Sequence, residues 1–190
     1  MKTLLSLAAL TLLVSALAFG QNNAGTAAQA LVTFEVGDQA LALEGVDASW
    51  GVLSNGVTYT ITAEGLITPV TPEGAFEVEP LYWIISGGAN VGAAVQVTFT
   101  LPPFFQGEGG TGFARIPFSV TSTSAGWFNE DPGPEVPYSP MDPRVPNTVY
   151  LNDGGEAFVG LGGVLTIPNN IPSEVVYEGV FIMTAAYTGF

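Results

Sequence analysis

The segment VQVTFTLPP, residues 95–103, decides the fold class. Apolar residues occupy every second position from Val95 to Leu101, and the positions between them hold Gln or Thr. Because side chains alternate between the two faces of a strand, this period of two predicts a β-strand with one buried face. The prolines that follow end the strand, since proline cannot donate a hydrogen bond to the ladder. Phe99 lies on the apolar face, as do Ile116 and Phe118 in a similar run, so all three are expected in the core.

The same pattern recurs along the rest of the chain. Alternating or wholly apolar runs are found at residues 32–36, 57–61, 81–85, 114–120, 159–167 and 177–187. Helix-period patterning is missing after residue 30, while 24 glycines and 14 prolines supply turns. Eight to ten antiparallel strands at regular spacing predict an all-β protein, namely an immunoglobulin-like β-sandwich over residues 30–190.

Two glycine-containing pairs mark expected irregularities in the strands. Asn55-Gly56 separates the run at 50–53 from the strand at 57–61 and predicts a hairpin turn, because both residues tolerate positive φ. Gly162-Gly163 interrupts the run at 159–167, which makes a β-bulge plausible there.

The N-terminal residues have the composition of a secretory signal. Lys2 supplies one positive charge, residues 4–17 form an apolar run, and Ala16-Leu17-Ala18 matches a small-x-small cleavage pattern. We predict a signal peptide at 1–18, with cleavage after Gly20 as the alternative, and then a flexible leader at 19–29. No second apolar stretch reaches the roughly 20 residues of a spanning helix, so no membrane span is expected. The predicted location is therefore extracellular or at the cell surface, with the periplasm in transit.

Charge and residue inventory exclude several classes of function. All 17 acidic residues follow the predicted signal, where only Arg115 and Arg144 oppose them, so the mature chain carries a net charge of −15. This balance excludes the basic surface that nucleic acid requires. The sequence has no His and no Cys, which excludes disulfides, Ser-His-Asp and Cys-His catalysis, and zinc or haem sites. We expect no enzyme activity and no cofactor.

Two loops carry clustered oxygen atoms that could bind calcium. Glu130 and Asp131 lie in one loop, and Asp153 and Glu156 lie in the other. Neither loop has the ligand spacing of an EF-hand, and ordinary turn chemistry is the competing explanation, since Asp-Gly favours a bend.

Aromatic residues suggest a carbohydrate-binding surface as a second alternative. The candidates are Trp50, Tyr82, Trp83, Trp127 and Tyr138. Core packing is the competing explanation, because large aromatic side chains dominate cores by area. Trp83 lies inside the apolar run at 81–85 and is expected in the core.

Residues 128–147 form a proline-rich arm, with six prolines in this stretch. From Pro134 to Pro146, five of them recur at every third residue, which is the period of a polyproline II helix. We expect a stiff, ordered crossover that runs along the sandwich, with a ligand for proline-reading domains as the alternative.

Several blocks together resemble a bacterial family of secreted domains of unknown function. They are WGVL at 50–53 with the Thr-rich strand after it, VQVTFTLP at 95–102, LGGVLTIP at 161–168, YEGV at 177–180 and TAAY at 184–187. The resemblance implies an immunoglobulin-like domain, distantly similar to pilin and spore-coat domains, with a surface or fimbria-like role and no catalytic residue. The spacing from Gly179 to Tyr187 is about four residues shorter than in chaperone–usher pilins, and the disulfide common in those proteins is missing.

The leading hypothesis is a non-catalytic structural or cell-surface interaction subunit that assembles by strand donation into a fimbria-like filament. Its partner would be another copy of the chain or another cell-surface protein. Val32, Phe34 and Val36, behind the leader, are the preferred donated strand, and Tyr177–Tyr187 is the other candidate. The alternatives are a secreted glycan- or calcium-binding module and a small outer-membrane β-barrel.

Overall fold

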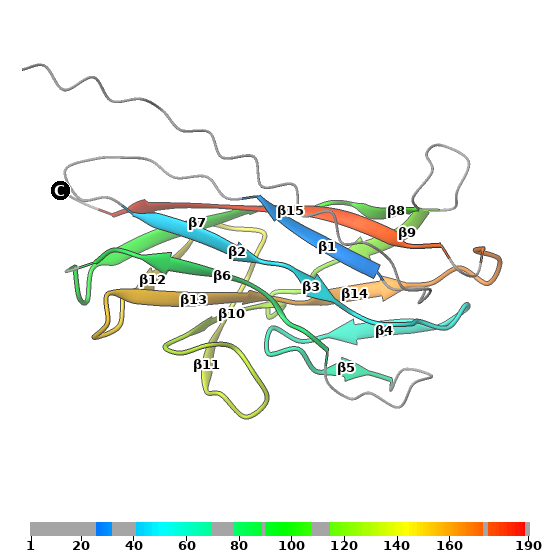
Figure 1. The fold of residues 1–190 in the computed structure, drawn as a ribbon, viewed down its shortest axis with the longest axis horizontal. Helices are drawn as coiled ribbons and strands as arrows, with labels where there is room; N and C mark the ends of the chain where they lie inside the picture. The colour runs from blue at the N-terminus through cyan, green and yellow to red at the C-terminus, as the bar shows by residue number, and fades with distance from the viewer. Residues whose placement is uncertain are drawn as a thin grey trace, which may run out of the picture.

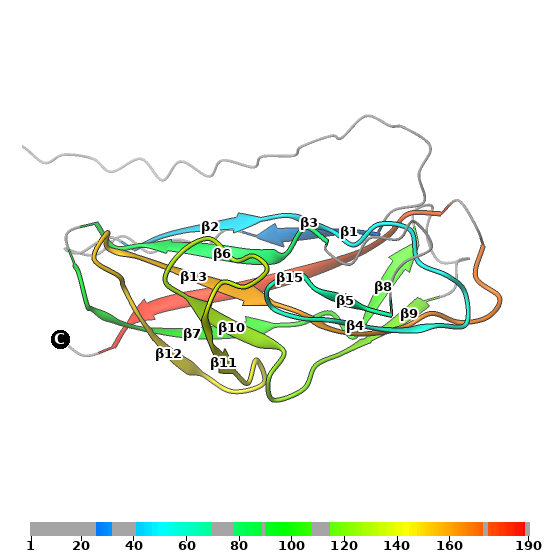
Figure 2. The ribbon, with the colours of Figure 1, turned by 90° about the horizontal axis from the view of Figure 1, so that it is seen from below.

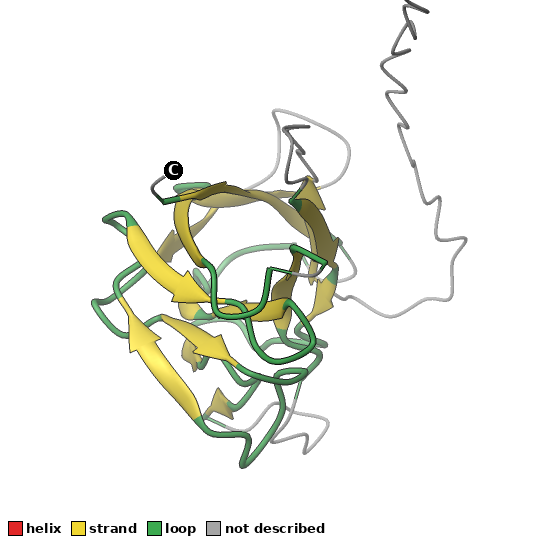
Figure 3. Ribbon diagram, turned by 90° about the vertical axis from the view of Figure 1, so that its left-hand side faces the viewer, coloured by secondary structure: helices red, strands yellow, loops and turns green. Residues whose placement is uncertain are grey.

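A computed structural model describes residues 26–31, 41–69, 78–88, 90–107, 115–172 and 175–188. Within these residues there are strands, turns and loops and no helix (Figure 3), which confirms the all-β prediction. The strands are β1 (Thr26–Leu31), β2 (Ala42–Val46), β3 (Ala48–Ser49), β4 (Thr58–Ile61), β5 (Ile67–Thr68), β6 (Leu81–Ser86), β7 (Ala94–Thr100), β8 (Phe104–Gly107), β9 (Arg115–Ser119), β10 (Ala125–Phe128), β11 (Tyr138–Met141), β12 (Asn147–Tyr150), β13 (Glu156–Leu161), β14 (Gly163–Thr166) and β15 (Tyr177–Tyr187).

The strands form two sheets that pack as a sandwich, as predicted (Figures 1 and 2). The five-stranded sheet has the order β11-β10-β13-β6-β2. The larger sheet follows the path β12-β7-β15-β8-β9-β14-β4-β5, and β1 and β3 join it beside β15 to make ten strands. Among the described strand pairs, β1–β15 is parallel and every other pair is antiparallel.

Alternation places one face of each central strand in the core between the sheets. In β6, Leu81, Trp83 and Ile85 are buried, and the residues between them are partly exposed. In β7, Val95 and Val97 are fully buried, as the period of two predicts.

The three residues expected in the core differ in their burial. Ile116 and Phe118 are buried, as predicted. Phe99 is only partly buried, and its ring packs edge-on against Trp83 with 5.7 Å between the ring centroids. Phe99 lies near the end of β7, just before the chain leaves the strand for Pro102, which explains its lower burial.

More strands are described than the eight to ten that alternation predicted, because several runs are divided. The run at 159–167 becomes β13, which pairs with β6 and β10, and β14, which pairs with β4 and β9. The chain therefore passes from the five-stranded to the ten-stranded sheet at Gly162, where a bulge was expected. Residues 101–103 similarly separate β7 from β8, and the two-residue strands β3 and β5 are too short to show a period.

The hairpin predicted at Asn55-Gly56 is wrong, although the turn itself is present. Gly56 has a φ of +75°, the left-handed conformation expected of a turn glycine. The segment before the turn does not pair with β4, whose described partners are β5 and β14. Instead Trp50 is buried in the core, with 1% of its surface exposed, and this draws the chain at 50–53 away from the sheet.

The proline-rich arm is a crossover, as predicted, but not one continuous polyproline II helix. β11 pairs with β10 at the edge of the five-stranded sheet, and the chain then crosses to β12 in the larger sheet. Two turns break the period of three: Val136 N–H donates to the carbonyl of Gly133 (3.1 Å), and Val145 N–H donates to that of Asp142 (3.3 Å). Glu135, with a φ of +69°, has a conformation that polyproline II does not allow.

Candidate functional site

Strand β1 lies where the two sheets approach each other. On one edge, Thr26–Leu31 pairs residue by residue with positions 177–182 of β15; on the other edge, Ala27 and Ala28 pair with the two residues of β3. β3 follows β2 after one residue, and β2 belongs to the five-stranded sheet. In Figure 1, β1 accordingly lies between β15 and the β2–β3 segment. We call this strip, bounded by residues 177–182 of β15 and by β3, the β1 seam.

The two walls of the seam contribute to the main aromatic cluster of the core. Trp50 directly follows β3 and Phe181 belongs to β15, and their ring centroids are 6.3 Å apart. Phe105 lies 5.4 Å from Trp50 and 5.8 Å from Phe181, and Phe118 lies 5.1 Å from Phe181. All four rings are buried. The seam is thus built on a rigid, densely packed support.

Gly179 brings β15 close to this support. A Cβ at this position would lie 3.1 Å from the ring of Phe105, which is tighter than ordinary contact. Gly179 is aligned with Ala28 of β1 in the parallel register. Gly179 therefore lies on β15 at the level where β1 pairs on both of its edges.

A single short connection ties β1 to the rest of the described chain. Residues 32–40 join it to Leu41, and nine residues reach at most about 30 Å. β1 and β15 come from opposite ends of the chain, so no local turn fixes their pairing. The strand ladder therefore sets the register of β1, and the connection of residues 32–40 limits how far β1 can move from Leu41.

The structure does not test the predicted donated strand. Val32, Phe34 and Val36 lie outside the described residues. β1 begins earlier, at Thr26, within the stretch 19–29 that was predicted to be a flexible leader. Its sequence TAAQAL has no apolar alternation, so no sequence signal could have identified this strand.

The other candidate strand, Tyr177–Tyr187, coincides with β15. Its inward residues Phe181 and Met183 are fully buried, whereas Val180 on the opposite face is 52% exposed. β15 pairs with β1 on one edge and with β7 and β8 on the other, so it is central in its sheet. It therefore acts as an acceptor of strands in this structure.

The four calcium candidates come from loops that touch each other. The amide of Asn152 donates to the carbonyl of Asn129 (2.7 Å), which joins the loop of Glu130 and Asp131 to the loop of Asp153 and Glu156. The side-chain oxygen of Asn152 already accepts the N–H groups of Gly154 (2.9 Å) and Glu156 (3.0 Å). Across the described residues, no group of three or more acidic side chains gathers to hold an ion.

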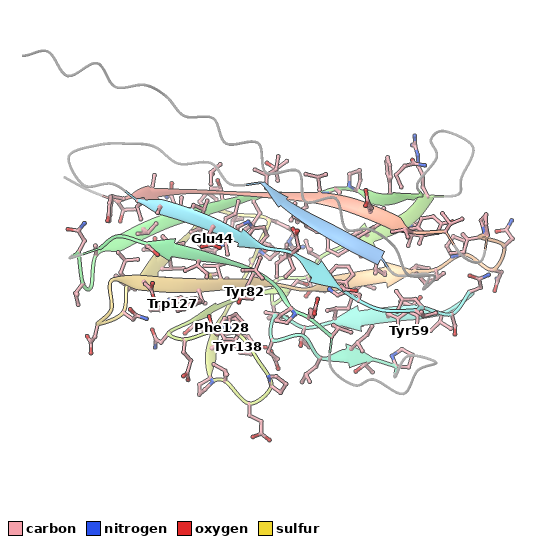
Figure 4. All side chains as sticks on the ribbon, viewed as in Figure 1. Glu44, Tyr59, Tyr82, Trp127, Phe128 and Tyr138 are labelled. Atoms are coloured by element: carbon pink, nitrogen blue, oxygen red, sulfur yellow. The ribbon has the colours of Figure 1, made fainter. Side chains whose placement is uncertain are left out.

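The aromatic candidates divide into two groups. Trp50 and Trp83 are core residues, and Trp127 packs against the core with its ring 5.6 Å from that of Tyr150. Tyr82 and Tyr138 are partly exposed and pack around the buried Phe128 on the outer face of the five-stranded sheet (Figure 4).

The two outer tyrosines lie in an acidic environment. Burial raises the pKa of Tyr82 above 10.0, and the nearby negative charges of Asp131 and Glu44 raise it further. Burial also raises the pKa of Tyr138, with a further contribution from the hydrogen bond that its hydroxyl donates to Glu64. An acidic, aromatic surface of this kind offers ring faces and hydrogen-bond acceptors to a ligand.

Both arginines are engaged within the chain. Arg144 forms an exposed ion pair with Asp142, with 2.8 Å between Nη2 and Oδ2. Arg115 lies 4.2 Å above the ring of Phe104 and donates through Nε to the side chain of Gln106 (3.3 Å). Two arginines cannot neutralise 17 acidic side chains, so electrostatic repulsion between copies is expected.

No family model matches the sequence, and comparison with curated proteins finds no match. The described part of the chain has no helix that is both long and apolar enough to cross a membrane.

Proposed function

We propose that this protein is a non-catalytic structural subunit, exported to the cell surface or beyond, that assembles with its partners by strand addition at the β1 seam. The observation that carries the proposal is the parallel β1–β15 pair. A strand from the far end of the chain completes a sheet edge here, with only a short connection to hold it. The fimbria-like role implied by the family resemblance belongs to the same proposal.

Strand addition fits the chemistry of the seam. Without β1, the backbone N–H and C=O groups along six residues of β15 and two residues of β3 would lose their partners. A strand of almost any sequence can satisfy such groups, because the main chain supplies most of the affinity. The composition of β1, in which three of six residues are alanine, agrees with recognition through the backbone.

The non-catalytic and exported parts of the proposal rest on the sequence. A chain without His and Cys, and without lysine after the signal, lacks the side chains that most often act as general base or activated nucleophile, although carboxylates and hydroxyls remain. The charged, apolar and small-residue order of residues 1–18 supports export.

The proposal is tested by removing the strand and returning it as a peptide. The mature chain lacking residues 19–36 should unfold at a lower temperature than the full mature chain, and a peptide of residues 19–36 should bind it. Binding to the folded state alone stabilises it by about 2.7 kcal/mol when the peptide exceeds its Kd a hundredfold. Calorimetric titration and thermal unfolding measure the two effects.

A peptide with Ala27→Pro and Ala28→Pro is the matched control. Neighbouring amides of a strand point to opposite sides, so one of the two prolines removes a donor that faces β15. This control should bind much more weakly than the natural peptide. The proposal is wrong if the truncated chain has the same unfolding temperature as the full mature chain and binds neither peptide.

The outer face of the five-stranded sheet supports a second candidate function, glycan binding. Tyr82 and Tyr138 are partly exposed there, and Glu44 and Asp131 lie near Tyr82. Aromatic rings can stack on sugar rings while carboxylates accept hydrogen bonds from sugar hydroxyls. A glycan array probed with the mature chain and with Tyr82→Ala tests this, and binding unaffected by the substitution would exclude this surface.

A further inference from the structure

We propose that the strand filling the β1 seam in the assembled state is β1 of a second copy of this chain. This inference rests on the proposed function and names its partner. The segment Thr26–Leu31 already matches the seam over its full length, in a defined parallel register. A second copy presents the same segment and the same register, so exchange needs no new recognition surface.

The energetic balance between the two arrangements is close. All contacts of β1 with β15 and β3 are the same whether β1 comes from its own chain or from a neighbour. Only the connection differs, since residues 32–40 hold β1 near its own seam at an effective concentration on the order of mM. Own-chain filling should therefore dominate in dilute solution, and exchange should appear as the protein approaches mM concentration.

Charge modulates this balance. A net charge of −15 on each mature copy opposes close approach of two copies. Salt screens such repulsion, with a Debye length of about 8 Å at 0.15 M and about 3 Å at 1 M. Exchange should consequently increase with ionic strength, whereas filling within one chain should respond little.

The geometry allows both a closed and an open product. Two copies that donate β1 to each other form a closed pair, and copies that donate serially form a chain with one unfilled seam at its end. Both products join β1 of one copy to β15 of another, so either product agrees with the inference.

The chain has no cysteine, so engineered cysteines report this pairing without background. Gln29 is aligned with Val180, whose side chain is 52% exposed and can be replaced without disturbing the core. Paired strands lie about 4.8 Å apart, within the range of about 4.4–6.8 Å between Cα atoms that a disulfide accepts.

The experiment mixes two single variants of the full mature chain, Gln29→Cys and Val180→Cys, under a mild oxidant. Pairing of β1 of one chain with β15 of the other holds these two cysteines together, so it should give far more of this disulfide than random collision does. We expect a shift from the mass of one chain to that of two, increasing with protein concentration and with salt. Peptide mapping should place the disulfide between residues 29 and 180.

A mixture of Gln29→Cys with Thr184→Cys is the matched control. Thr184 is exposed on the same face of β15 but lies beyond the residues aligned with β1. This mixture should show little of the shift, because only random collision can join the two residues. Equal cross-linking in both mixtures would overturn the inference.

The double variant Gln29→Cys/Val180→Cys separates failure of the inference from failure of the proposed function. If it closes a disulfide within one chain, while the mixed single variants stay separate up to mM concentration, exchange between copies is wrong. The proposed function still stands in that case if the truncated chain binds the 19–36 peptide. If the disulfide forms in neither arrangement, and also not between Ala27→Cys and Glu178→Cys, the register itself is wrong and the inference falls.

Discussion

Gly162 is a position where a single added methyl group should damage the fold. It lies between β13 and β14, where the chain passes from one sheet to the other. A Cβ at this position would overlap the carbonyl oxygen of Ile61 and lie 2.7 Å from the carbonyl carbons of Ile61 and Thr62. These are backbone atoms of a paired strand and its turn, so they cannot rotate away as a side chain could.

The magnitude of Gly162→Ala follows from two opposing terms. Inserting an atom into a packed region costs about 1–3 kcal/mol, and an obstructing backbone favours the upper end of that range. Alanine also restricts the unfolded chain, which returns about 0.4–1 kcal/mol. The net destabilisation should be about 2 kcal/mol, or a decrease in Tm of about 4–8 °C for a chain of this length.

Thermal unfolding followed by circular dichroism measures this change, and Gly133→Ala is the control. At Gly133 the nearest atom to an added Cβ is a methyl carbon of Val136, 3.9 Å away. The control should change stability by no more than about 0.5 kcal/mol or slightly increase it. If Gly162→Ala has the same Tm as the Gly133→Ala control, the backbone of residues 61 and 62 does not approach Gly162 as closely as described.

Three further predictions concern the core and the ionisable groups. Phe118→Ala should lower the free energy of unfolding by about 3–5 kcal/mol in denaturant titration, because this buried ring contacts three other aromatic rings. NMR should show the carboxyl of Asp142 titrating with a pKa of about 2, below its usual 3.8, because Arg144 donates hydrogen bonds to it, and Arg144→Gln should raise that pKa. Since the folded pKa is the lower one, this pair favours the folded state above about pH 4 and loses its effect as the pH falls toward 2. Ring-carbon NMR should show that Glu64→Gln lowers the pKa of Tyr138 only part of the way, because burial is the larger cause of its increase.

The sequence identified strands well wherever one face is buried and the other is not. β15 has the predicted bounds, and β7 alternates from Val95 as expected. In both strands every second side chain faces the core and is apolar, so the strand can be recognised from the hydropathy of its residues. The two apolar faces of 177–187 were also visible, although only the structure shows that Phe181 faces the core and Val180 the solvent.

Features that depend on backbone pairing could not be predicted from side-chain hydropathy. Half of the residues of β1 are alanine, whose small side chain carries little hydropathy signal, and its partner β15 lies far away in the sequence. Asn55-Gly56 correctly indicated a turn conformation, but turn chemistry does not determine which segments pair. The regular prolines of 134–146 are compatible with polyproline II and also with turns and an edge strand. The backbone hydrogen bonds of this segment form two turns and the edge strand β11.

Gly162 and the β1 seam differ in how their strands are held. At Gly162 the passage is covalently continuous, because β13 and β14 are one segment locked by close contact with the backbone of residues 61 and 62. At the β1 seam the bridging strand is a separate segment, held by its ladder with β15 and β3. Local opening requires breaking only the contacts of the segment that leaves, so it costs less where no continuous strand crosses. Opening of the sandwich should thus begin at the seam, and the exposed edge would be the one that matches β1 of a neighbouring copy. If copies exchange β1 as we propose, assembly starts at this edge and does not require unfolding of the rest of the domain.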